Sequence, residues 1–276
     1  MYQGASEGIG WSQATILNSD LPPRAQREPV LQEMALSLVI NGAPYAVMMI
    51  TPLDQDDFVR GFLWGEGVLQ DLNEIIAWEW VRGEGGDAAY LQLAAGAAER
   101  VARKRRCVVG ASACGLCGTP CFEELVAFSS LCDERVVPAG LIHERMDHMV
   151  CHQVLNRDTG TAHAAILASA TETLVREDIG RHNAVDKVIG AALARGWRRG
   201  DATFLGVSSR LSFEIALKAL GFAVPVVAAI SGVSSLAVQT AERHGLSLIG
   251  YARDRRMTVY AHPERLALMP AAKDGA

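Results

Sequence analysis

The sequence predicts an α/β protein whose C-terminal half forms a sheet with parallel strands and helical cover, after a smaller α+β N-terminal subdomain. From residue 160 onward, short apolar runs of strand length alternate with segments whose apolar residues recur at helical spacing. Before that point, the strong hairpin dipeptide Asn41-Gly42 precedes a single clear helical pattern. The chain has 276 residues, which is enough for one large domain or two modest ones.

Composition divides the chain into three parts. Residues 1–27 are rich in Gly and Ser and then in Pro, so we expect a flexible tail. Residues 28–140 are expected to form the N-terminal subdomain, which ends in a loop containing a cysteine pair. Residues 141–276 are expected to form the C-terminal core.

The N-terminal subdomain is expected to open with a hairpin over residues 30–50. A helix should follow, with Thr51 as its cap, Pro52 in the first helical position and an end at Gly65 or Gly67. The other expected elements here are strands at 75–81 and 89–94, a loop at 112–118 and a helix at 120–128.

The C-terminal core is expected to begin with paired strands at 164–168 and 173–176. Apolar residues between Ala184 and Leu193 then fall on one helical face. The remaining expected elements are a strand at 203–207, a helix at 213–220, a strand at 224–230, a helix at 236–243 closed by Gly245, and strands at 246–251 and 257–261.

Charge and apolar patterning exclude several classes of protein. The formal net charge of −5 argues against broad, nonspecific nucleic-acid binding, although it permits a local basic pocket. Residues 219–241 carry no charge, but only Phe222 to Ile230 is strongly apolar, which is too short for a membrane span. The first residues lack the basic start and apolar run typical of a secretory signal, and six cysteines in a chain of this length do not predict a disulfide scaffold. We therefore expect a cytoplasmic protein without nucleic-acid or membrane partners.

The cysteine pair Cys114 and Cys117 has the spacing C-x-x-C in a Gly-flanked loop. A thiolate is the nucleophile in sulfur transfer, and the basic run at 103–106 is a candidate to stabilise it. A persulfide on one cysteine can be released when the second cysteine attacks it. The spacing therefore supplies a sulfur carrier and a resolving partner.

Spacing alone leaves other roles for this pair open. A structural zinc site needs two more ligands, and the chain has no second C-x-x-C. An iron–sulfur site would use Cys114, Cys117 and Cys121, in the reverse of the usual radical-enzyme order. The aromatic and proline residues typical of a thioredoxin-like redox pair are missing around Gly115-Leu116. We predict no bound metal.

Polar residues gather at three strand-to-helix junctions of the core. Arg176 to Asn183 precedes an apolar helix on which His182 and Asp186 share one face, as do Asn183 and Lys187. Ser208-Ser209-Arg210 follows the next strand, and Ser231 to Ser235 the one after. Helix N-termini at the carboxyl ends of strands bind anions, so the sequence predicts two phosphate cradles side by side. The basic stretch Arg253 to Arg256 would add an anion clamp.

Two of these segments resemble the hallmark motifs of one family. The stretch SACGLCG at 112–118 and the stretch REDIGRHNAVDKVIG at 176–190 are similar to motifs of the FdhD family of formate dehydrogenase accessory proteins. Shorter matches include His163-Ala164-Ala165 and Arg210 to Glu214, and the resemblance covers about residues 28–265. The family pattern usually has Ser-Gly-Arg where this chain has Ser208-Ser209-Arg210, which puts the phosphate geometry at Ser209 in doubt.

The resemblance implies a sulfurtransferase that acts as a sulfur carrier. It would take persulfide sulfur from a cysteine desulfurase and pass it to the bis-guanine-dinucleotide molybdenum cofactor, which formate dehydrogenase needs; GDP would mimic that cofactor. The implied protein is a homodimer with a cytidine-deaminase-like, three-layer core. Cys114 would carry the persulfide, with Cys117 as its partner. The expected cofactor-binding residues are Arg181, His182, Lys187, Ser208, Ser209 and Arg210, with Tyr251, Ala252, Arg253, Asp254, Arg255 and Arg256.

Two rival functions make different demands on the sequence. A zinc-dependent deaminase needs H-x-E and P-C-x-x-C motifs, but Ala165 replaces the glutamate and Glu124 replaces the second cysteine. A noncatalytic chaperone that only holds the cofactor is the other alternative, and sulfur loading separates it from a carrier.

Overall fold

The computed structural model describes residues 8–107, 131 and 135–267 of the chain. The C-terminal core is built on a six-stranded mixed sheet with the order β13-β12-β11-β10-β8-β9. β10, β11 and β12 run parallel, while β8, β9 and β13 pair antiparallel with their neighbours. The strands are β8 (His163–Ala168), β9 (Thr173–Asp178), β10 (Phe204–Val207), β11 (Val226–Ala229), β12 (Ser247–Arg253) and β13 (Arg256–Ala261). The expected α/β class and each expected core strand are confirmed.

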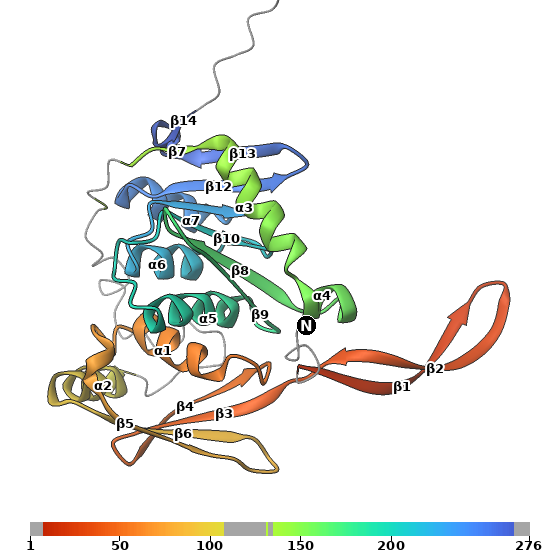
Figure 1. Ribbon diagram of the computed structural model, residues 1–276, viewed down its shortest axis with the longest axis horizontal. Helices are drawn as coiled ribbons and strands as arrows, with labels where there is room; N and C mark the ends of the chain where they lie inside the picture. Colours follow the sequence, from red (N-terminus) through yellow and green to blue (C-terminus); the bar gives the residue numbers. More distant parts are fainter. Residues whose placement is uncertain (1–7, 108–130, 132–134, 268–276) are drawn as a thin grey trace, which may run out of the picture.

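Helices cover both faces of this sheet (Figure 1). Alternate residues of β8 point to opposite sides: Ala165 and Leu167 join one apolar cluster, and Ala164 and Ile166 join another. One cluster contains α5 (Arg181–Ala194), α6 (Phe213–Gly221) and α7 (Ser235–His244), and the other contains α3 (Ala139–Cys151). The sequence did not predict α3 or the short α4 (Val154–Thr159). The narrower expectation of a cytidine-deaminase-like core stays a prediction.

The N-terminal subdomain is a four-stranded sheet with the order β4-β3-β6-β5. Asn41 and Gly42, with φ of 49° and 76°, form the predicted turn between β3 and β4. The helices α1 and α2 pack on the sheet's buried face around Phe58 and Leu63. The elements are β3 (Met34–Ile40), β4 (Ala43–Ile50), α1 (Gln55–Gly65), η1 (Leu72–Glu74), β5 (Ile75–Val81), β6 (Asp87–Leu93) and α2 (Ala95–Cys107).

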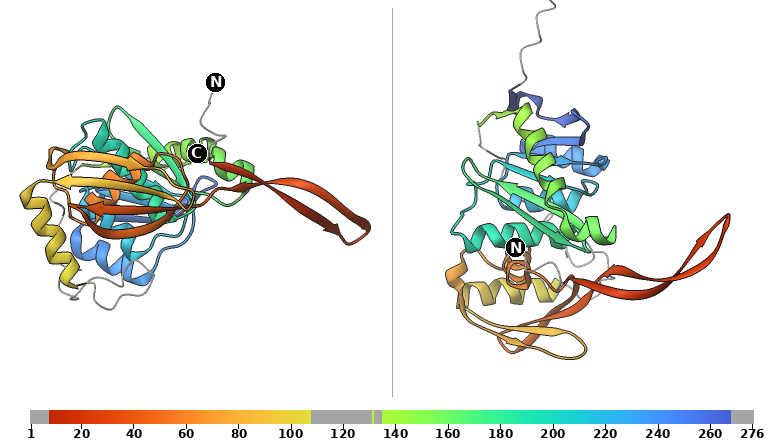
Figure 2. Two further views of the ribbon diagram at one scale, coloured as in Figure 1. Left: turned by 90° about the horizontal axis from the view of Figure 1, so that it is seen from below. Right: turned by 45° about the vertical axis from the view of Figure 1, so that its right-hand side comes forward.

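The expected flexible tail at residues 1–27 is wrong for residues 9–27. β1 (Ile9–Asn18) and β2 (Leu21–Leu31) pair into an antiparallel hairpin that projects from the body (Figures 1 and 2). Pro22 and Pro23 of β2 lie where the register of the hairpin shifts, opposite the irregularity between Ile16 and Asn18. Prolines in strands are confined to such irregularities and to free edges. The short strand β7 (Val137–Pro138) pairs in parallel with β14 (Leu266–Ala267), which follows the 3₁₀ turn η3 (Pro263–Arg265).

The expected cap of the first helix is also wrong. α1 begins at Gln55, with Asp54 at its N-cap in a left-handed conformation, rather than after Thr51. The buried hydroxyl of Thr51 instead accepts from the backbone N–H of Ile179 at 3.1 Å, and its own N–H donates to Asp178 at 3.0 Å. Thr51 thus ties the N-terminal subdomain to the core. No helix within the described ranges is long and apolar enough to cross a membrane.

The two subdomains meet where α1 crosses α5 (Figure 2). A methyl carbon added at Gly61 would lie 1.8 Å from the carbonyl oxygen of Asp186, and one added at Gly190 would lie 1.8 Å from that of Asp57. The two helix backbones therefore touch directly. Only glycine, which has no Cβ, allows this approach.

We predict that Gly61→Ala destabilises the protein strongly, because the added methyl must push α1 away from α5. Overpacking commonly costs about 1–3 kcal/mol, and a backbone clash this close should reach the upper end or beyond. Urea unfolding followed by circular dichroism measures the change. Gly140→Ala is the matched control, since Gly140 also lies in a helix but has open space around it. Equal stability of the two variants would contradict the crossing as described.

Candidate functional site

The site is built at the edge of the core sheet where β10, β11 and β12 end. β8 runs antiparallel to β10, so the first residues of β8 lie beside the end of β10. Two hydrogen bonds join Ser208, which follows β10, to Ala164 of β8. The Ser208 N–H donates to the Ala164 carbonyl at 2.9 Å, and the Ser208 hydroxyl accepts from the Ala164 N–H at 2.8 Å. His163 pairs in turn with Asp178 at the end of β9, from which α5 starts. The start of α5 and the end of β10 therefore share one edge.

Backbone hydrogen bonds connect the loops that follow the parallel strands. The Leu211 N–H donates to the Gly232 carbonyl, and the Ser234 N–H donates to the Leu211 carbonyl, both at 3.0 Å. The Tyr251 N–H donates to the Ser231 carbonyl at 3.0 Å. A Cβ at Gly232 would lie 2.8 Å from the Tyr251 hydroxyl, so the ring lies against this loop. The edge is a connected surface.

Four predicted or matched side chains come together here from different segments. Arg181 and His182 lie in the first turn of α5, and Arg210 follows β10. His182 Nε2 lies 3.8 Å from Glu214 Oε2 on α6. The Nε of Arg181 is buried without a hydrogen-bond partner. Across the part of the chain that the structure describes, no carboxylate forms an ion pair with Arg181 or Arg210, so both cations are available to an anion.

The protonation states at this edge follow from burial and charge. Burial and the Arg181 guanidinium lower the pKa of His182 to about 4, although Glu214 opposes the shift. Burial and the same guanidinium lower the pKa of His163, with Arg210 adding to the effect. Burial would raise the pKa of Glu214, but hydrogen bonds from Ser212 and its own backbone bring it below its usual value. At neutral pH both imidazoles are neutral and the carboxylate is charged.

Lys187 was predicted to bind the cofactor, but its side chain is buried beneath this edge and is not exposed on it. Its side chain is 0% exposed, and its Nζ lies 2.7 Å from Asp178 Oδ2 and 3.0 Å from the Thr51 carbonyl. A third contact, at 3.4 Å, reaches the Glu177 carbonyl. The ammonium is fully occupied by protein acceptors, so its role is structural. Ser209 is also buried, and its hydroxyl donates to the Arg210 carbonyl at 3.0 Å.

The predicted segment from Tyr251 to Arg256 forms the β12–β13 hairpin. Asp254 and Arg255 make a tight turn with φ of 53° and 58°, and Arg253 pairs with Arg256 beside it. The turn leaves the sheet at the same edge as the arginine–histidine cluster, on a strand two places from β10. Tyr251 is exposed, whereas the Ala252 side chain is buried against the α3 face. The structure thus brings the backbone of this segment to the edge and turns Ala252 inward.

Cys114 and Cys117 lie outside the described residues. The described part of the chain contains no group of three or more His, Cys, Asp or Glu side chains placed to hold a metal. Cys151, the last residue of α3, is exposed.

The chain matches the FdhD/NarQ family model over residues 31–267. It belongs to the FdhD/NarQ family. It is 39% identical to the sulfur carrier protein FdhD of Variovorax paradoxus (strain S110) over 89% of both chains. It is 34% identical to that of Bordetella bronchiseptica over 90% of both. Its fold is similar to the crystal structure of a protein from Desulfotalea psychrophila that is described as a formate dehydrogenase accessory protein. The TM-score is 0.74 and the sequence identity 23%, and the match covers 94% of this chain and 99% of the other.

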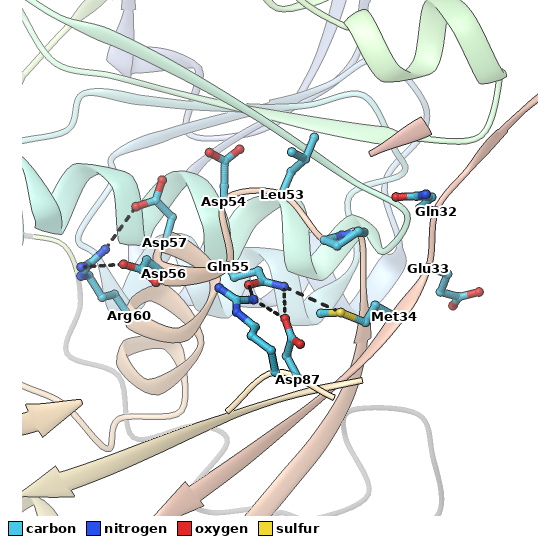
Figure 3. A pocket seen from close by; sticks show the side chains of 12 residues that line it. Gln32, Glu33, Met34, Leu53, Asp54, Gln55, Asp56, Asp57, Arg60 and Asp87 are labelled. Carbon is cyan, nitrogen blue, oxygen red and sulfur yellow. Dashed lines mark hydrogen bonds and ion pairs between the residues drawn. The ribbon is translucent and has the colours of Figure 1, made fainter. Parts of the chain in front are cut away.

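A large open cavity of about 1110 Å³ lies elsewhere in this FdhD/NarQ chain, at the start of α1 (Figure 3). Its charged lining is mostly acidic: Glu33, Asp54, Asp56, Asp57 and Asp87, with Arg60 and Arg82. The two arginines bind lining residues, Arg82 to Asp87 and Arg60 to Asp56 and Asp57. An acidic surface repels phosphate, whereas the sheet edge carries arginines without carboxylate partners among the described residues. None of the predicted site residues that the structure describes lines this cavity.

Two residues of the edge were not predicted to bind the cofactor. In the sequence, His163 and Glu214 are notable only because they belong to short stretches that resemble the family. His163 reaches the edge because β8 pairs antiparallel with β10, and Glu214 because α6 starts there. Local patterning contains no signal for either position.

We predict that Lys187→Met destabilises this FdhD/NarQ fold because it leaves the Asp178 carboxylate buried without its counter-ion. Removing one partner of a buried pair costs roughly 3–5 kcal/mol. The double variant with Asp178→Asn should lose less than the sum of the two single variants, since each removes the same interaction. Chemical denaturation of the four proteins measures the coupling. Additive losses would show that the pair does not act as a unit.

Proposed function

We propose that this protein is a sulfur carrier that supports formate dehydrogenase, with Cys114 as the residue that carries sulfur. The observation that carries the proposal is the similarity to proteins named sulfur carrier protein FdhD, at 39% identity over 89% of both chains. The Cys114-Gly-Leu-Cys117 sequence supplies the thiols that such a role needs. The cysteine desulfurase partner and the homodimer stay predictions.

The proposed chemistry is a persulfide relay. The Cys114 thiolate attacks the outer sulfur of the desulfurase persulfide, so that a new S–S bond forms and the desulfurase cysteine leaves as a thiolate. Cys117 then attacks the Cys114 sulfur, which forms a disulfide and releases hydrosulfide toward the cofactor. A cellular dithiol must reduce that disulfide before the next cycle. On this basis the protein acts as a sulfurtransferase.

The acceptor in this proposal is the bis-guanine-dinucleotide molybdenum cofactor, bound as a substrate. Its diphosphates would lie at the sheet edge, beside Arg181 and Arg210. The unpartnered Arg181 Nε and the missing carboxylate partners support the fit, since phosphate oxygens would satisfy both. The turn from Arg253 to Arg256 leaves the same edge and offers a second cationic group.

We predict that incubation with a cysteine desulfurase and cysteine adds the mass of one sulfur atom to the protein. Intact-mass spectrometry under non-reducing conditions reads the product. Cys114→Ala should not gain the sulfur, and Cys151→Ala, which removes an exposed thiol on α3, should gain it as the wild type does. Full sulfur loading of Cys114→Ala would assign the carrier to another residue. A wild type that shows neither the added sulfur nor the two-hydrogen loss of a Cys114–Cys117 disulfide would favour the noncatalytic chaperone.

We also predict that GDP binds to the edge and that Arg181→Gln weakens this binding about tenfold or more. A hydrogen bond to a charged group contributes roughly 1.5–3 kcal/mol. Calorimetry measures the affinity. Arg198→Gln is the control, because Arg198 is exposed on the segment that enters β10 from the opposite end. Equal GDP affinity in both variants would remove Arg181 from the site.

A further inference from the structure

The sheet edge carries two histidines among its arginines, and this inference rests on the cofactor binding there. His163 belongs to β8 and His182 to α5, and the two rings lie close enough to act on each other and on the same Arg181 guanidinium. His182 Nε2 lies 3.8 Å from Glu214 Oε2 and 3.5 Å from the Ser212 hydroxyl. A proton gained by His182 would thus meet a carboxylate that is already in position.

The charges that face these histidines do not balance. Lys218 acts on His182, but its ammonium lies 2.6 Å from Asp186 and is neutralised there. Asp178 acts on His163, but it is neutralised by Lys187 at 2.7 Å. Arg181 and Arg210 therefore remain, with Glu214 as the single unpaired carboxylate among the described residues that act on the two rings. The edge has an excess of positive charge that a bound anion would remove.

We propose that this edge is a proton-coupled diphosphate site, at which His163 and His182 take up protons when the diphosphate of a dinucleotide binds beside Arg181 and Arg210. Glu214 acts as a positioning residue that stabilises the protonated form of His182. Deprotonation weakens the hold on the diphosphate, so the proton state governs retention and release of the cofactor.

The direction of the pH dependence follows from the two states of each ring. In the free protein, burial and Arg181 lower the pKa of both histidines, that of His182 to about 4. A bound diphosphate raises these values, because it adds negative charge and screens the arginines. Between the free and bound pKa values the complex holds more protons than the free protein, so affinity rises as the pH falls. At pH values well above the bound pKa values both states are deprotonated and the dependence disappears.

The experiment uses a ligand that does not titrate in this range. Diguanosine diphosphate, a diphosphate bridging two guanosines, keeps a constant charge near neutral pH, unlike GDP. Calorimetry in buffers of different ionisation enthalpy counts the protons taken up on binding. For the wild type we expect three- to tenfold tighter binding at about pH 6 than at about pH 8, with net proton uptake at the lower pH; one proton changes affinity at most about tenfold per pH unit.

Variants assign the protons. His182→Gln and His163→Gln should each reduce the uptake, and the double variant should abolish it. Glu214→Gln should shift the pH dependence to lower pH, because the protonated ring loses its carboxylate. His262→Gln is the control, since His262 follows β13 at the opposite edge and pairs with Glu264. Asp186, whose pKa burial raises to about 6, is retained in every variant, so uptake that persists in the double variant would point to Asp186 and overturn the assignment.

The possible outcomes separate this inference from the proposed function. Binding that is equally tight at both pH values, without proton uptake in the wild type, overturns the proton coupling and leaves nucleotide binding standing. Absence of binding at every pH overturns both. The wild-type proton count needs no variant, so the test holds even where a substitution impairs folding.

Discussion

The close crossing of α1 and α5 at Gly61 and Gly190 is the constraint on which the rest of the structure depends. The helix backbones touch there, so a side chain on either glycine would separate the subdomains. The same interface contains the buried Lys187–Asp178 pair, which also binds the backbone of Thr51. Because α5 begins with Arg181 and His182, the interface that joins the subdomains also fixes the first turn of the helix that builds the site.

The sheet topology explains why the polar residues meet at one edge. Parallel strands β10, β11 and β12 all end there, which delivers three loops to the same side. The antiparallel strand β8 begins at that edge and adds His163, and β9 ends there and leads into α5. A mixed sheet thus gathers more functional segments at one edge than the parallel strands alone would deliver. As a result, arginines without carboxylate partners among the described residues lie beside neutral histidines at this edge.

The proposed function requires two kinds of chemistry, sulfur transfer and dinucleotide binding. Sulfur transfer needs a nucleophilic thiol and a resolving thiol, for which the sequence offers Cys114 and Cys117. Binding a large dinucleotide needs cationic groups at fixed positions. The start of α5 and the end of β10 supply them as Arg181 and Arg210. The acidic cavity at the start of α1 fits neither requirement, and its arginines are bound to its own carboxylates.

The sequence by itself determined the α/β class, the strands of the core sheet, the helices α5, α6 and α7, and the two motifs. Apolar periodicity and turn residues such as Asn41-Gly42 act over a few positions, so they can be read locally. Only the tertiary structure decided that Lys187 points into the core, that residues 9–27 form a hairpin, and that His163 and Glu214 join the site. These outcomes depend on partners far apart in the chain: the Thr51–Asp178 hydrogen bond spans 127 residues. No local pattern specifies which distant segment a side chain will meet.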